Sequence, residues 1–193
     1  MVPEAIVLAL IVGLIFRGKL TRLADIKIRY IWLIFVALGL SLAAREFREL
    51  VHQQTVVNQA AKIVQFLLLL FVGAANTRIA GVKLMMAGLV ANLAAILANG
   101  GVMPVSEPGM TIIAGKNLPE LLARYPFVKD MLVGPHTRLA ALCDIYPAYH
   151  PYVLFQSVYS LGDFITTIGC FIAIVAIMRG PAASRQKLVA NEA

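Results

Sequence analysis

Five stretches of this chain are long, apolar and almost free of charged residues. They cover about residues 2–16, 28–44, 56–75, 79–98 and 152–178. Each carries one charged side chain, which is Glu4, Arg29, Lys62, Lys83 and Asp163 in turn. A helix needs about 20 apolar residues to cross a bilayer, so these stretches predict five membrane-spanning helices. The chain of 193 residues then has little left for a soluble domain. The predicted fold is all-α, a single membrane domain over residues 1–193.

The composition supports the same class of protein. Apolar residues make up 60% of the chain and charged residues 14%, whereas a soluble domain has about 45–50% apolar and about 25% charged residues. These values exclude an ordinary soluble enzyme, a disordered chain and a disulfide-rich secreted scaffold. Cys143 and Cys170 do not have the spacing of a metal or redox site, and we interpret both as apolar filler.

The distribution of basic residues predicts the orientation in the membrane. The connection after the first stretch holds five cations: Arg17, Lys19, Arg22, Lys27 and Arg29. Because cytoplasmic loops are enriched in Lys and Arg, we expect this connection and the tail, residues 179–193, inside, and the N-terminus outside. No positive charge precedes the first stretch and no small-residue cleavage site follows it, so we interpret it as a span rather than a cleavable signal peptide.

Residues 99–151 form the one long polar segment, and this topology places them outside as a cap over the helices. They contain seven of the nine prolines, a density that disfavours long helices and central strands. We expect one short helix over residues 118–124, begun by Asn117 with Glu120 at the capping-box position. A second short helix is expected over residues 135–143.

Polar residues recur at helical spacing in three of the stretches. The fifth has Gln156, Ser160, Asp163, Thr167 and Cys170, the fourth has Gly88, Asn92, Ala95 and Asn99, and the third has Asn58, Lys62 and Gln65. Spacings of three and four residues put each set on one face of its helix. Asp163 is then expected about 11 residues, or ~16 Å, inside its span. A carboxylate at that depth is costly and usually faces a cavity or a bundle interior.

Together, the three polar faces predict a pocket that is open to the outside and covered by residues 99–151. Lys62 pairs with Asp163 if their faces meet, and otherwise extends towards the membrane surface. Two interpretations of Asp163 stay open: a group that binds a ligand or exchanges a proton, and a buried lock that only holds helices together. The small residues of the fourth stretch can also form a tight helix-packing face.

Several short motifs follow the fourth stretch. They are Asn99-Gly100-Gly101-Val102-Met103-Pro104-Val105, then His136, Asp144-Ile145-Tyr146-Pro147 and Ser160-Leu161-Gly162-Asp163. The two glycines can adopt the left-handed conformation that ends a helix. In these motifs the chain resembles an uncharacterised family of small bacterial multi-pass membrane proteins, over roughly its second half. The resemblance implies a place in the bacterial inner membrane and groups Asn99, Asp144 and Asp163 into one site, but it implies no activity.

We expect the protein to bind or transport a small polar or amphipathic, lipid-like molecule. The candidate ligand-binding residues are Asp163, Ser160, Asn92, Asn99, Lys62, Gln156, Asp144 and His136. One alternative is an accessory or structural subunit of a larger membrane complex. A second alternative is a membrane-embedded enzyme that acts on a lipid-linked substrate through Asp144, Asp163 and His136.

We expect no metal, no other cofactor and no nucleic-acid partner. His136, Asp144 and His150 are zinc-binding residue types, but their spacing matches no metal motif. The sequence has no nucleophilic-serine turn, phosphate-binding glycine-rich loop or Cys-x-x-Cys pair. The basic residues lie beside the apolar stretches, where anionic lipids and topology account for them. The expected partners are membrane lipids and a second copy of the chain or a larger membrane complex.

Overall fold

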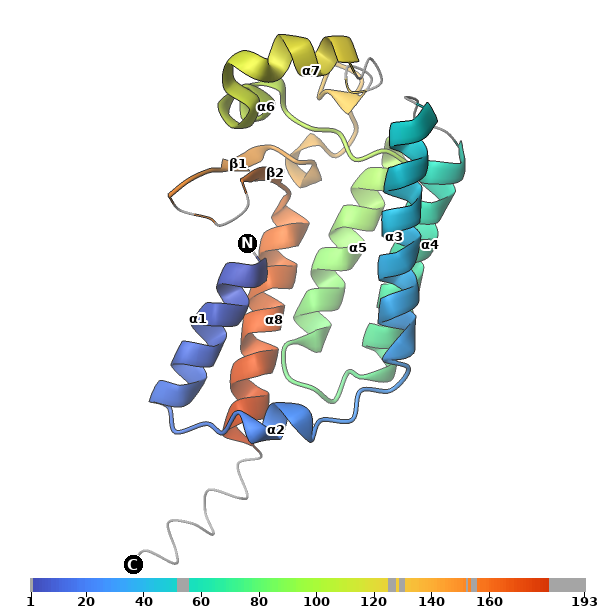
Figure 1. Cartoon of the computed structure of the whole chain (residues 1–193). Coiled ribbons are helices and arrows are strands. Elements are labelled where there is room, and N and C mark those ends of the chain that lie inside the picture. Colours follow the sequence, from blue (N-terminus) through green and yellow to red (C-terminus); the bar gives the residue numbers. More distant parts are fainter. Residues whose placement is uncertain are drawn as a thin grey trace, which may run out of the picture.

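The computed structural model describes residues 2–51, 56–124, 128, 131–151, 153 and 156–180. Within this part of the chain, one long helix forms in each apolar stretch (Figure 1): α1 (Val2–Ile15), α3 (Trp32–Val51), α4 (Val56–Ala75), α5 (Val82–Ala98) and α8 (Leu161–Arg179). Helix α1 packs on α8, α8 on α5, α5 on α4 and α4 on α3. The bundle is therefore a row of helices that runs from α1 to α3.

Short elements cover the bundle at the two ends of its long helices. Helix α2 (Thr21–Ala24) lies at one end, and α6 (Glu107–Ala114) and α7 (Leu118–Arg124) lie at the other (Figure 1). The connections from α1 to α3 and from α4 to α5 both lie at the α2 end, so most of the predicted inside cations gather there. Helix α1 starts at the opposite end of the bundle from the one where α8 finishes (Figure 1). Residues 181–193 of the predicted tail lie outside the described residues.

Two of the long helices have the length and apolar composition of a membrane span. They are α4 and α8, whereas α1 and α5 are apolar but shorter. Only 11% of the apolar window in α4 and 28% of that in α8 is buried inside the protein. Large apolar side chains are widely exposed, with Val56 at 78%, Ile15 at 70% and Phe35 at 67%. Exposure of this kind favours an apolar environment around the bundle, because water-facing surfaces rarely carry such patches.

The last helix begins later in the sequence than predicted. Helix α8 starts at Leu161 rather than at residue 152, and part of the expected helix is instead the strand β2 (Ser157–Tyr159). Strand β2 pairs antiparallel with β1 (Tyr146–Ala148). The expectation of a helix over residues 156–160 is therefore wrong, and the mostly helical fold includes this small sheet. Residues 152, 154 and 155 of the expected helix lie outside the described residues.

A capping box sets the start of α8. The Ser160 hydroxyl accepts a hydrogen bond from the backbone N–H of Asp163, and the Asp163 carboxylate accepts one from the backbone N–H of Ser160, both at 3.0 Å. Asp163 is therefore in the first turn of α8, and the predicted depth of about 11 residues inside a span is wrong. A carboxylate in the first turn is stabilised by the helix dipole, so its presence does not require a polar cavity in the membrane interior.

The segment between α5 and α8 consists of short elements, in line with its proline content. Helix α7 covers the residues that the sequence predicted, and Gly100 (φ +69°) and Gly101 (φ +86°) end α5 in the left-handed conformation. The helix predicted over residues 135–143 is wrong, because a short 3-10 helix, Ala140–Leu142, is the helical part of that range.

The hydrophobic core lies where this segment meets the helices. Ala95 and Ile96 of α5 form a buried cluster with Met103 and Cys143 of the segment. Side chains of α4 pack against the same cluster, among them Phe66. The segment is thus attached to the bundle by apolar contacts.

Candidate functional site

Helices α5 and α8 pack closely because glycines line their contact. A Cβ atom added to Gly88 of α5 would collide with the carbonyl oxygen of Gly162 and with the side chain of Thr166. A Cβ atom added to Gly169 of α8 would lie 2.6 Å from the backbone nitrogen of Met85. The small-residue face predicted on the fourth stretch therefore packs against α8 of the same chain.

This close contact brings together three of the predicted site residues, Asn92, Ser160 and Asp163, which we call the polar lock. The Asn92 side-chain amide donates to Asp163 Oδ1 at 2.8 Å, and the Ser160 hydroxyl donates to Asn92 Oδ1 at 2.7 Å. Ser160 is completely buried and Asn92 is 6% exposed. Because buried polar groups need hydrogen-bond partners, this mutual bonding favours a role in holding α5 to the start of α8.

Asp144 places a second carboxyl group close to the polar lock. It lies in the cap segment, where its backbone N–H donates to the Pro104 carbonyl at 3.0 Å and its carbonyl accepts from the Ser106 N–H at 2.8 Å. The pKa of Asp144 is raised from 3.8 to about 7, because burial, the largest cause, and the nearby charge of Asp163 both raise it, while Lys62 lowers it. The structure thus brings Asp144 into electrostatic range of both Asp163 and Lys62.

The other candidates lie elsewhere. The Asn99 side chain accepts from the backbone N–H of Arg138 at 2.9 Å and donates to the carbonyls of Arg138 and Ala95, both at 2.8 Å. His136 is exposed and shares with Asn99 the lining of a shallow groove of about 400 Å³. Gln156 is exposed and precedes β2.

The polar face of α4 is directed at α3. Asn58, Lys62 and Gln65 line a groove of about 250 Å³ together with Ser41 and Arg45 of α3. The three predicted polar faces therefore do not all meet. Those of α5 and α8 contact each other, whereas that of α4 faces α3. Among the residues that the structure describes, no three His, Cys, Asp or Glu side chains form a group that could hold a metal ion.

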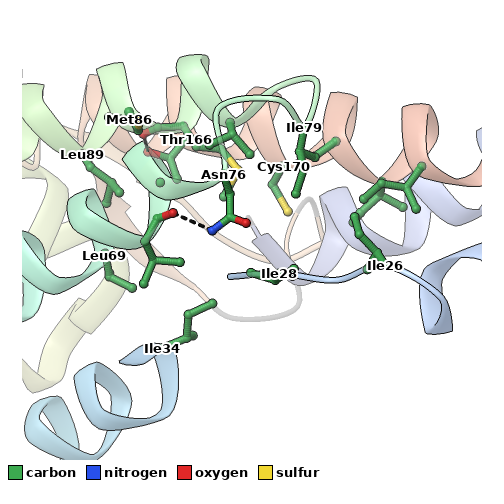
Figure 2. Close-up of a pocket in the computed structure, with 17 residues that line it drawn as sticks. Ile26, Ile28, Ile34, Leu69, Asn76, Ile79, Met86, Leu89, Thr166 and Cys170 are labelled. Atoms are coloured by element: carbon green, nitrogen blue, oxygen red, sulfur yellow. Dashed lines mark hydrogen bonds between the residues drawn. The ribbon is translucent and has the colours of Figure 1, made fainter. Parts of the chain in front are cut away.

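An apolar cavity that the sequence did not predict lies at the α2 end of the bundle (Figure 2). It has a volume of about 280 Å³ and is walled by α4, α5, α8 and the segment that leads into the start of α3. Of its 17 lining residues, all are apolar or glycine except Asn76, Thr166 and Cys170. Its volume is close to the lower end of the range for ligand pockets, about 300–1,000 Å³. No periodic pattern marks such a cavity, because it forms where neighbouring elements leave space between them.

The polar groups on the cavity wall are bonded to the protein. The Asn76 side chain accepts from the Arg29 N–H at 2.8 Å and donates to the Arg29 carbonyl at 2.9 Å and the Val72 carbonyl at 2.7 Å. The Thr166 hydroxyl donates to the Met85 carbonyl at 3.4 Å. Asn76 thereby fixes the stretch before α3 against the end of α4. An apolar cavity with satisfied polar groups can stay dry and accept apolar molecules.

Comparison with known proteins gives one match. A family model described as a family of unknown function, DUF5317, matches residues 25–175, which include every candidate residue named above. Neither the curated proteins nor the solved structures gave a match. The matched region is well over half of the chain and agrees with the expected membership in an uncharacterised family. The chain therefore belongs to the DUF5317 family of unknown function.

Proposed function

We propose that this protein is a multi-pass protein of the bacterial inner membrane that binds an amphipathic, lipid-like molecule. The hydrocarbon chain of that molecule occupies the apolar cavity between α4, α5 and α8. The observation that carries the proposal is this cavity of about 280 Å³ with its apolar lining. The ligand class is the one that the sequence suggested, whereas the position is at the α2 end rather than around Asp163.

The surface of the bundle supports a place in the membrane. Helices α4 and α8 are apolar and largely unburied within the protein, as expected for helices that lipid covers. The cations of the α1–α3 connection lie at the α2 end, which makes that end the cytoplasmic one by the positive-inside rule. The apolar cavity is then in the half of the bundle nearest the cytoplasm.

The chemistry of the cavity wall favours a hydrocarbon chain over a polar ligand. Branched aliphatic side chains from all four walls contribute to it, and Met85 and Met86 add flexible side chains that adapt to irregular shapes. The amide of Asn76 is engaged by three backbone groups. A polar molecule would lose hydrogen bonds to water here without regaining them from the wall.

Native mass spectrometry of the protein purified in a mild detergent tests the proposal. The cavity is filled by Cys170→Phe, and Ile168→Phe is the matched control, because Cys170 lines the cavity while Ile168 is 52% exposed on the same helix. We expect the wild type and the control to retain a lipid-like adduct that the cavity variant loses. Ala173→Leu is a second cavity variant, and thermal unfolding checks that each variant is folded. Equal retention by folded cavity variants and wild type would contradict the proposal.

The pocket predicted around Asp163 is tested with the same measurement. If a ligand binds beside the polar lock, Asp163→Asn loses the adduct while Cys170→Phe retains it. If the lock only joins the two helices, Asp163→Asn retains the adduct and is less stable to heating, since the capping box and the bond to Asn92 both use the carboxylate.

A further inference from the structure

The apolar cavity adjoins a second, charged groove at the α2 end. This groove has a volume of about 590 Å³, and Ile26, Ile79 and Ile177 line both spaces. Its other walls include Arg22, Arg78 and one acidic residue. An apolar chamber that shares three walls with a charged groove has the layout expected for a molecule with a hydrocarbon tail and a charged head.

The two arginines of the groove are held differently. Arg22 of α2 is half-buried, and its Nη1 donates to the carbonyls of Met178 at 2.9 Å and Arg179 at 2.6 Å. A guanidinium has five N–H donors, so the end of α8 engages one nitrogen and fixes the position of the group. Arg78 is exposed in the connection between α4 and α5. The groove therefore combines one fixed and one exposed guanidinium.

The charge balance of the groove favours an anion. Asp25 lines it too and opposes an anion, but two guanidinium groups outweigh one carboxylate. The surrounding α2 end adds further cations: Arg17, Lys19, Lys27 and Arg29. Basic pockets between membrane helices on the cytoplasmic side bind anionic lipid headgroups.

We infer that the ligand is an anionic phospholipid, with its phosphate headgroup at Arg78 and Arg22 and a hydrocarbon chain in the adjoining apolar cavity. The inference rests on the proposed function and names its ligand class. Guanidinium groups suit this role because they bind phosphate oxygens through two parallel hydrogen bonds. Ile26, Ile79 and Ile177 form the passage where the chain leaves the headgroup groove.

A competition between two phospholipids with identical chains tests the headgroup. Delipidated protein in a neutral detergent receives equal amounts of anionic phosphatidylglycerol and zwitterionic phosphatidylcholine, and native mass spectrometry counts each bound lipid. We expect the wild type to prefer phosphatidylglycerol and Arg78→Gln to lower that preference about fivefold. Total bound lipid stays close to the wild-type amount, because the cavity is unchanged. Arg17→Gln removes an exposed arginine at the same end but outside the groove; it is the matched control and is expected to lower the preference less than Arg78→Gln does.

The possible results separate this inference from the proposed function. Equal binding of the two lipids by the wild type, or an unchanged preference in Arg78→Gln, overturns the anionic headgroup while lipid binding stands. No bound lipid of either kind in the wild type overturns the proposed function itself. Arg78→Lys retains the charge and is expected to keep most of the preference, and added salt is expected to weaken it.

Discussion

Asp144→Asn is expected to remove a large part of the pH dependence of stability. In the folded protein the pKa of Asp144 is about 7, against 3.8 for an unburied aspartate, with burial as the main cause. Between these two values the folded protein holds a proton that the unfolded chain releases, so rising pH lowers the free energy of unfolding. The contribution is complete below pH ~4 and is lost as the pH rises through about 7.

The size of the effect follows from the two pKa values. One pKa unit corresponds to about 1.4 kcal/mol, so the difference between 3.8 and about 7 sets an upper limit of ~4 kcal/mol. Because Asp144 is partly exposed, solvent screening lowers the expected loss to ~2 kcal/mol. For a chain of this length, that loss corresponds to a melting temperature about 4–8 °C lower near pH ~8 than near pH ~4.

Thermal unfolding in a nonionic detergent measures this effect. The neutral amide of Asp144→Asn cannot ionise, so the variant is expected to melt at nearly the same temperature at both pH values and above the wild type near pH ~8. Asp25→Asn, which removes an exposed aspartate at the other end of the bundle, is the control and should follow the wild type. An Asp144→Asn variant as sensitive to pH as the wild type would refute the reasoning.

Two further predictions concern the contact between α5 and α8. Asn92→Ala removes both side-chain hydrogen bonds that Asn92 makes in the polar lock and leaves the buried Ser160 hydroxyl with one partner fewer. The free energy of unfolding should therefore fall by ~1–3 kcal/mol. Chemical or thermal unfolding of the purified variant measures this loss, and an unchanged stability would argue against the lock. Gly88→Leu places a large side chain against the backbone of α8, so we expect little folded protein by size-exclusion chromatography. A well-folded Gly88→Leu variant would show that the two helices do not pack this closely.

Several predictions based on local signals agree with the structure. The third apolar stretch, residues 56–75, has the same bounds as helix α4, and α7 covers the residues expected from its capping pattern. Gly100 and Gly101 end α5 as predicted. Each of these features depends on neighbours within a few residues, such as a run of apolar side chains, a capping group or a left-handed glycine.

The start of α8 was predicted wrongly, although the sequence contains a local signal for it. The Ser-x-x-Asp spacing of Ser160 and Asp163 is typical of a helix start, yet the apolar residues before it extended the predicted helix backwards. Those residues include β2, whose partner β1 lies on the other side of a connection. The pairing of two short strands cannot be recognised from hydropathy alone, since a short apolar run suits either a helix or a strand.

The sequence by itself determined the family, the mostly helical fold and the two helices long and apolar enough to cross a membrane, because these depend on composition and local order. Only the tertiary structure decided which polar groups meet. Asn92 bonds with Ser160 and Asp163 because glycines allow α5 and α8 to approach closely. The apolar cavity and the arginine groove beside it arise from how four separate segments pack. Empty space between helices is a property of the assembled bundle, and no single segment encodes it.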